Sequence, residues 1–141
     1  MNTELDYIHF NIFGLGLSCL ATGTGSISER ISRAYNGYFH KISWEKDLAF
    51  IPHDYKSEFL LLKKKLHDDI VDKIDKERNE LRRLHPELTE DLIREICNCT
   101  TVLKTLHWKK SKAIVELISN IYFGLGLELK EQGREKVRQN R

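Results

Sequence analysis

The sequence predicts an all-α fold, a single-domain bundle of about five helices. Three observations lead to this prediction. Residues 54–84 contain no glycine or proline and are rich in leucine, lysine, glutamate and arginine, which favour helices. The apolar residues of this segment recur at intervals of three, four and seven, as on one face of an amphipathic helix. Only two prolines and eight glycines occur in 141 residues, which leaves room for long helices.

Residues 54–84 are expected to form the longest helix, a rod of roughly 45 Å at the usual helical rise. Its apolar stripe consists of Phe59, Leu62, Leu66, Ile70, Ile74, Leu81 and Leu84. Lys73 and Glu77 interrupt the stripe at positions where leucine would be expected. Either this part of the helix leaves the main core and its charges are solvated, or the charges form a polar cluster at an interface.

Four further helices complete the predicted bundle. They span residues 4–21, 27–42, 90–107 and 108–130, with a connector at 44–51. A short turn after Leu84 predicts that residues 54–84 and 90–107 form a long antiparallel helix 3–helix 4 hairpin. The stripe of the second hairpin helix is expected to be Leu92, Ile96, Cys99, Leu103 and Leu106. Residues 1–132 form the single helical domain, and 133–141 are expected to be a charged, frayed or disordered tail.

Composition and charge place the chain among cytoplasmic proteins. The formal net charge of +2 argues against a strongly electrostatic nucleic-acid binder but leaves room for a local basic patch. Three cysteines are an odd number and indicate reduced thiols. The apolar run at residues 10–21 is too short to cross a membrane, and Glu4 and Asp6 stand where a signal peptide would be basic.

The first helix is apolar on nearly all sides, which predicts a place in the core or at an interface. The predicted interface residues are Ile8, Ile12, Phe13 and Leu17. Residues 11–17 are also echoed by residues 120–127, with one residue inserted. This echo is either a coincidence or a sign that the first and last helices lie against each other, with their glycines at the crossing and the termini close together.

A candidate catalytic motif lies at the end of the longest helix. Arg78 is followed by Asn79, and His85 comes seven residues after Arg78, so the arginine and histidine share a helix face. This pattern resembles the R-x4-6-H motif of the HEPN superfamily of small helical proteins. The resemblance implies metal-independent RNA cleavage at a composite site in a dimer. Arg78 would stabilise phosphate charge, Asn79 would help place the RNA, and His85 would transfer protons.

The sequence departs from that motif at Pro86, directly after His85. The alternative is a solvated hairpin tip without catalytic function.

Two other patterns concern ligands. Cys97, Cys99 and His107 could supply metal ligands, but residues two apart on a continuous helix point about 200° apart, so no metal site is expected. Lys109, Lys110 and Lys112 follow Trp108, and cations beside an aromatic residue are found on some RNA-contacting surfaces. No cofactor-binding motif stands out.

The leading functional prediction is a non-enzymatic helical interaction or accessory protein that self-associates or docks on a larger protein partner. Two alternatives stay open. One is a HEPN-like ribonuclease of toxin or anti-phage type that uses Arg78, Asn79 and His85. The other is an accessory subunit that binds nucleic acid through Lys109, Lys110 and Lys112. No cofactor, metal or membrane is expected in any of the three.

Overall fold

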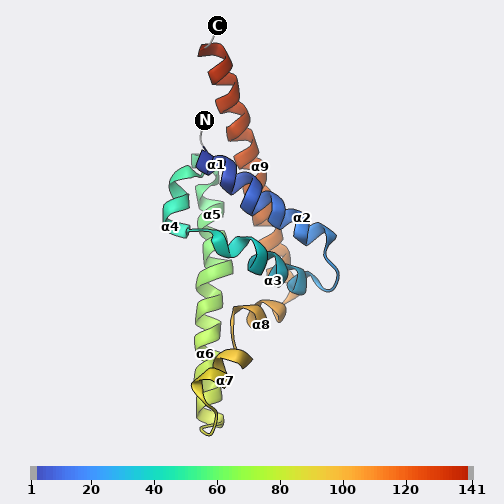
Figure 1. The fold of residues 1–141 in the computed structure, drawn as a ribbon, viewed down its shortest axis with the longest axis vertical. Helices are drawn as coiled ribbons and strands as arrows, with labels where there is room; N and C mark the ends of the chain where they lie inside the picture. Colours follow the sequence, from blue (N-terminus) through green and yellow to red (C-terminus); the bar gives the residue numbers. More distant parts are fainter. Residues whose placement is uncertain (1–2, 140–141) are drawn as a thin grey trace.

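A computed structural model describes residues 3–139 as an all-α fold in which no strand occurs (Figure 1). The predicted fold class is therefore confirmed. The elements in chain order are α1 (Thr3–Tyr7), η1 (Ile8–Gly14), α2 (Leu15–Thr22), α3 (Ile27–Gly37), η2 (Phe39–Lys41), α4 (Trp44–Asp47), η3 (Leu48–Phe50), η4 (His53–Tyr55), α5 (Lys56–Lys63), η5 (Lys64–Asp68), α6 (Asp69–Leu84), α7 (Glu90–Ile96), α8 (Cys99–Lys104) and α9 (Trp108–Gln139). None of the helices in this described part combines the length and apolar character needed to cross a membrane.

The helix predicted over residues 54–84 is present as α5, η5 and α6, which follow one another without a break in helical backbone. It is not the longest helix, because α9 extends over 32 residues. The central segment η5 is a π-helical turn, which the sequence pattern did not predict. Phe59, Leu62 and Leu66 are fully buried and Ile70 is 3% exposed, whereas Ile74 and Leu81 are only partly buried. Full burial thus ends at Ile70, although Ile74 and Leu81 still pack against the core. Figure 1 shows α6 projecting at one end of the molecule.

The first predicted helix is also one continuous helical segment, formed by α1, η1 and α2. Its middle part η1 is π-helical, with a wider turn than an α-helix. This segment buries Ile8, Ile12 and Phe13 against the rest of the fold. The second predicted helix is shorter than expected, because α3 ends at Gly37 and a 3-10 turn follows it.

The second helix of the predicted hairpin is two helices, and the prediction of one helix over residues 90–107 is wrong. Cys97 (φ −124°, ψ 104°) and Asn98 (φ −147°, ψ 178°) have extended backbone between α7 and α8. The Asn98 side chain accepts a hydrogen bond from the Thr101 amide, and the Thr101 hydroxyl accepts one from the Asn98 amide. This capping box starts a new helix, so the chain changes direction and α8 packs against both α3 and α6.

The last helix is longer than predicted. α9 runs from Trp108 to Gln139, so residues 133–139, expected to be frayed or disordered, continue the helix. Residues 140 and 141, which belong to the same predicted tail, lie outside the described part of the chain. Figure 1 shows the end of α9 extending beyond α1, opposite to the end from which α6 projects.

The first and last helices do lie against each other, as the sequence echo suggested. The rings of His9 and Tyr122 stack with their centroids 4.5 Å apart and an interplanar angle of 5°. A Cβ atom on Gly14 would lie 3.4 Å from the Tyr122 ring, and one on Gly126 would lie 3.3 Å from the His9 ring. One glycine of each echoed segment therefore sits at the crossing of η1 and α9.

The second glycine of each echoed segment receives an aromatic ring from another element. A Cβ atom on Gly16 would lie 2.3 Å from the Phe39 ring, and one on Gly124 would lie 2.5 Å from the Tyr55 ring. Both distances are too short for real Cβ contacts. Glycine is thus needed at these positions for close packing, although both residues lie within helices.

Substitution of Gly124 by alanine is expected to destabilise the fold, because the new methyl group would displace the Tyr55 ring. Overpacking of this kind costs about 1–3 kcal/mol. Gly133 is the matched control in the same helix, since a Cβ atom added there would meet no atom within 4 Å. Gly133→Ala should raise stability by up to about 1 kcal/mol through helix propensity. Urea unfolding measures both free energies, and equal stability of the two variants would contradict the packing role assigned to Gly124.

Candidate functional site

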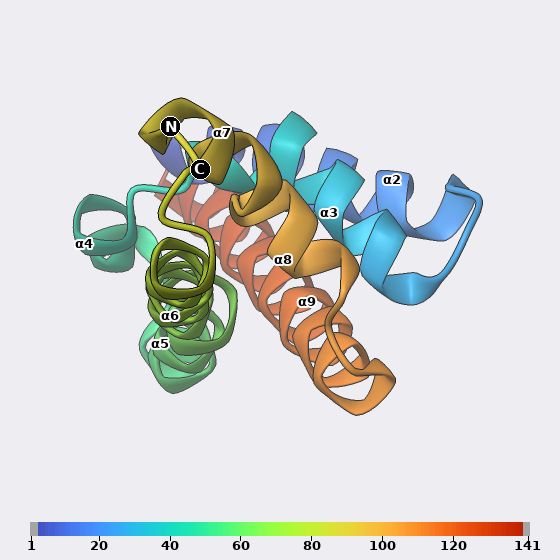
Figure 2. The same ribbon diagram turned by 90° about the horizontal axis from the view of Figure 1, so that it is seen from below.

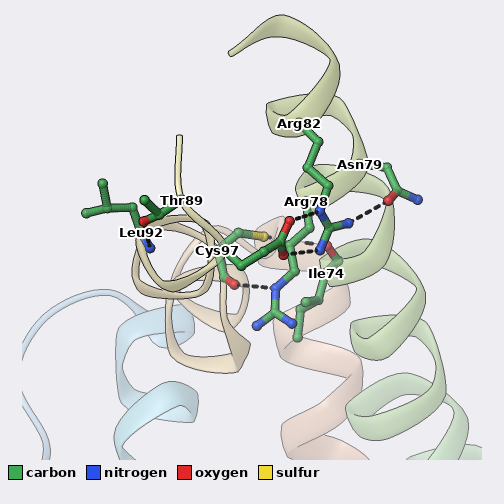
Figure 3. Close-up of polar contacts among 8 residues, drawn as sticks. Ile74, Arg78, Asn79, Arg82, Thr89, Leu92 and Cys97 are labelled. Carbon is green, nitrogen blue, oxygen red and sulfur yellow. Dashed lines mark hydrogen bonds and ion pairs between the residues drawn. The ribbon is translucent and has the colours of Figure 1, made fainter. Parts of the chain in front are cut away.

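Two of the three candidate catalytic residues, Arg78 and Asn79, lie on α6 close to the connection between α7 and α8 (Figure 3). The Arg78 Nε atom donates a hydrogen bond to the Cys97 carbonyl oxygen at 2.9 Å. Carbonyl groups at the end of a helix lack partners within that helix, and Cys97 is the residue at which α7 ends. The Arg78 guanidinium supplies one such partner, so it fastens the end of α7 to α6.

Cys97 adds a second connection at the same place. The residue is 2% exposed, and its thiol donates to the Glu77 carboxylate at 3.3 Å and to the Ile74 carbonyl at 3.7 Å. Burial, together with the hydrogen bond to Glu77, raises the pKa of the Cys97 thiol to about 11. A thiol with this pKa is protonated at neutral pH and is a poor nucleophile and metal ligand.

Arg82 joins α6 to the beginning of α7. Its Nε and Nη2 atoms donate to the two carboxylate oxygens of Glu90, each at 2.9 Å. Its Nη1 atom donates to the Asn79 side-chain oxygen at 2.8 Å, as Figure 3 shows. The hydrogen bonds from Arg82 lower the pKa of the Glu90 carboxyl below its usual range. Asn79, the predicted RNA-placing residue, is therefore occupied in orienting Arg82.

His85 ends α6 and points to the turn rather than to the partners of Arg78. Its side chain is 53% exposed, and its Nδ1 atom lies 3.2 Å from a Glu87 carboxylate oxygen. Among residues 3–139, no hydrogen bond links His85 to Arg78 or Asn79. Within one chain, the three predicted catalytic residues thus take part in three separate contacts. The predicted ribonuclease site stays a prediction.

The outer side of α7 exposes apolar residues that the sequence assigned to an inward-facing stripe. Leu92 is 44% exposed and Ile96 50% exposed, whereas Ile93 is 1% exposed and buried. The difference arises because α7 is only seven residues long and contacts α6 through the side that carries Ile93. Leu84, at the end of α6, is also 54% exposed. The end of α6 together with α7 is called the α6–α7 tip below.

The predicted interface residues of the first helix lie inside the chain's own core. Ile8, Ile12 and Phe13 are at most 2% exposed, and Leu17 is partly buried against the same core. The fold itself therefore accounts for the apolar character of three of these four positions.

The predicted nucleic-acid-binding lysines lie at the beginning of α9. Lys109, Lys110 and Lys112 are exposed, and the Lys109 Nζ atom lies 5.7 Å from the centroid of the Trp108 ring. No group of three or more His, Cys, Asp or Glu side chains in the described residues is placed to hold a metal ion. The sequence argument against a Cys97–Cys99 metal site assumed a continuous helix, but extended backbone separates the two residues.

Removal of Arg78 is expected to loosen the attachment of α7. Arg78→Ala leaves the part-buried Cys97 carbonyl without its guanidinium donor, and an unsatisfied buried acceptor costs about 1–3 kcal/mol. Arg83→Ala is the control, because among residues 3–139 Arg83 pairs only with Glu80, on the exposed face of α6. Loss of such a surface pair costs about 1 kcal/mol or less. Equal unfolding free energies for the two variants in urea titrations would contradict the role assigned to Arg78.

Comparison with known proteins gives no relative from which a role could be transferred. No protein-family model, curated protein or solved structure significantly matches the chain. The functional argument therefore depends on the geometry of the chain's own residues.

Proposed function

We propose that this protein is a non-enzymatic interaction protein that pairs with a second copy of itself through the α6–α7 tip. The observation that carries the proposal is the exposure of Leu92 and Ile96 on one side of α7. Residues four apart lie on the same face of a helix, so the two side chains form one apolar strip. Apolar side chains that face water do not stabilise the chain, whereas a partner surface would bury this strip.

The charges beside this strip favour a second copy of the chain as the partner. Arg82 pairs with Glu90, Arg83 with Glu80, and His85 lies against Glu87. Arg82 and Arg83 thus each have an acidic partner within the chain, which reduces the repulsion between two identical tips. A symmetric pair uses the same patch twice, so one apolar strip flanked by balanced charge is sufficient for a dimer.

Sedimentation velocity over a concentration series tests the proposal. The wild-type chain should dimerise reversibly, and the double variant Leu92→Glu/Ile96→Glu should remain monomeric because it places two buried charges in the interface. Phe123→Glu/Leu127→Glu is the matched control. These residues form the same four-residue spacing on α9 and are 62% and 47% exposed. A wild-type chain that stays monomeric at submillimolar concentration, or a control that dissociates instead, would overturn the proposal.

The ribonuclease alternative makes a different prediction for His85. Arg78 donates through Nε, and no hydrogen bond of its two Nη atoms occurs within residues 3–139, so these donors remain available to a phosphate. Under the non-enzymatic proposal, wild type and His85→Ala should both leave a fluorogenic RNA substrate intact. The His85 side chain is exposed, so its removal should not unfold the chain. Cleavage by wild type that is lost in His85→Ala would favour the enzyme.

A further inference from the structure

The structure brings together two lysine clusters that are far apart in the sequence. A hollow of about 60 Å³ lies between the η5–α6 part of the long helix and the start of α9. Its lining residues are Lys65, Asp69, Ile70, Lys73, Leu106, Lys110 and Ile114. Drug-sized ligands need pockets of roughly 300–1,000 Å³. The hollow is therefore too small to enclose a cofactor. The charged residues at its edge can bind only a molecule that lies across its opening.

The rim of this hollow carries unneutralised positive charge. Lys65, Lys73 and Lys110 form no salt bridge with any acidic side chain in the described residues. Asp69, which also lines the hollow, has Lys64 as its partner at 3.7 Å. Three lysine residues from two facing helices thus line one small hollow, which is called the basic cleft below.

The start of α9 increases this positive charge in a way that the fold does not require. The first turn of α9 contains no acidic residue, although the positive end of a helix dipole favours acidic side chains and disfavours lysine. Lys109, Lys110 and Lys112 nevertheless cluster there. Phosphate groups placed at this position would interact favourably with both the lysines and the helix dipole.

An exposed aromatic ring stands beside one of these cations, Lys109. Trp108 begins α9 and is 59% exposed. The Lys109 Nζ atom lies 5.7 Å from the centroid of the Trp108 ring. The centroids of the His107 and Trp108 rings are 5.8 Å apart, with an interplanar angle of 30°. A large aromatic face that is open to solvent next to ammonium groups is the arrangement on which unpaired bases stack.

We propose that the basic cleft binds single-stranded nucleic acid, with backbone phosphates on Lys65, Lys73 and Lys110 and a base stacked on Trp108. A base within a duplex has no free face for the indole, so the aromatic residue favours a single strand. An anionic membrane fits the site less well, because the lysines surround a recess between two helices and do not flank a continuous apolar surface. This binding does not depend on dimerisation through the α6–α7 tip.

Fluorescence anisotropy with a short labelled oligothymidylate at low salt tests this proposal on the full chain. The triple variant Lys65→Ala/Lys73→Ala/Lys110→Ala should bind at least about tenfold more weakly. Its slope of log affinity against log salt should be smaller by about 2, since each lost phosphate contact removes about 0.7. Trp108→Ala should weaken binding to the single strand by about tenfold and change binding to a duplex much less.

A second triple variant provides the charge-matched control. Lys46 on α4 and Lys130 and Lys136 on α9 are exposed and lie outside the basic cleft. Their joint replacement by alanine removes the same charge and should leave the affinity near that of wild type. Circular dichroism checks that every variant keeps its helical content.

Three results would overturn the proposal. Wild type that does not bind the oligonucleotide at low salt excludes the cleft as a nucleic-acid site. Equal losses in the two triple variants would mean that binding reflects overall charge only. Binding to phosphatidylserine vesicles, in the absence of binding to the oligonucleotide, would assign the lysines and Trp108 to a membrane surface.

Discussion

Burial of the apolar face of α9 is the constraint on which the rest of the fold depends. Ile114, Ile118, Ile121 and Leu125 on this face are at most 1% exposed. Each such side chain contributes about 1.5–3 kcal/mol when it is removed from water. No single neighbour covers this face, since η1, α3 and α5 all pack against α9. In the view along the long axis, α9 runs obliquely, with α5 and α6 on one side of it and α2 and α3 on the other (Figure 2).

The two projecting ends of the molecule are held in different ways. The upper end in Figure 1 is a direct continuation of α9, whereas the lower end is α6 with the short helix α7 packed against it. Ile93 is buried there but does not belong to the main core. The attachment of α7 to α6 also relies on polar contacts made by Arg78 and Arg82. The Arg82–Glu90 contact is exposed, and contacts of this kind stabilise weakly, whereas the Arg78 hydrogen bond to the Cys97 carbonyl is part-buried.

The sequence was informative about features that depend on the apolar pattern within a single helix. The stripe from Phe59 to Ile70 predicted the long helix, and the end of full burial at Ile70 agrees with one of the two interpretations of its interruption near Lys73. The break at Asn98 was missed, because the apolar residues on either side of it still fit one helical period. The Asn98–Thr101 capping box was a local signal that could have shown the break.

Features that depend on contacts between distant residues could not be derived from the sequence. Lys65 and Lys110 lie 45 residues apart, and only the packing of η5 against α9 brings them to one hollow. The ring contacts of Gly16 and Gly124 likewise require knowledge of where Phe39 and Tyr55 lie. The candidate catalytic motif was local, but helix spacing alone did not indicate that Arg78 contacts the Cys97 carbonyl.

The reactivity of the buried Cys97 thiol would indicate how often α7 detaches from the rest of the chain. While α7 is docked, low solvent access and a pKa of about 11 both keep this sulfur unreactive. Detachment of α7 would remove both restraints at once and give a thiol of ordinary acidity. The rate at which an alkylating reagent modifies Cys97 would therefore follow the population of chains in which this end of the molecule is open, without any engineered label.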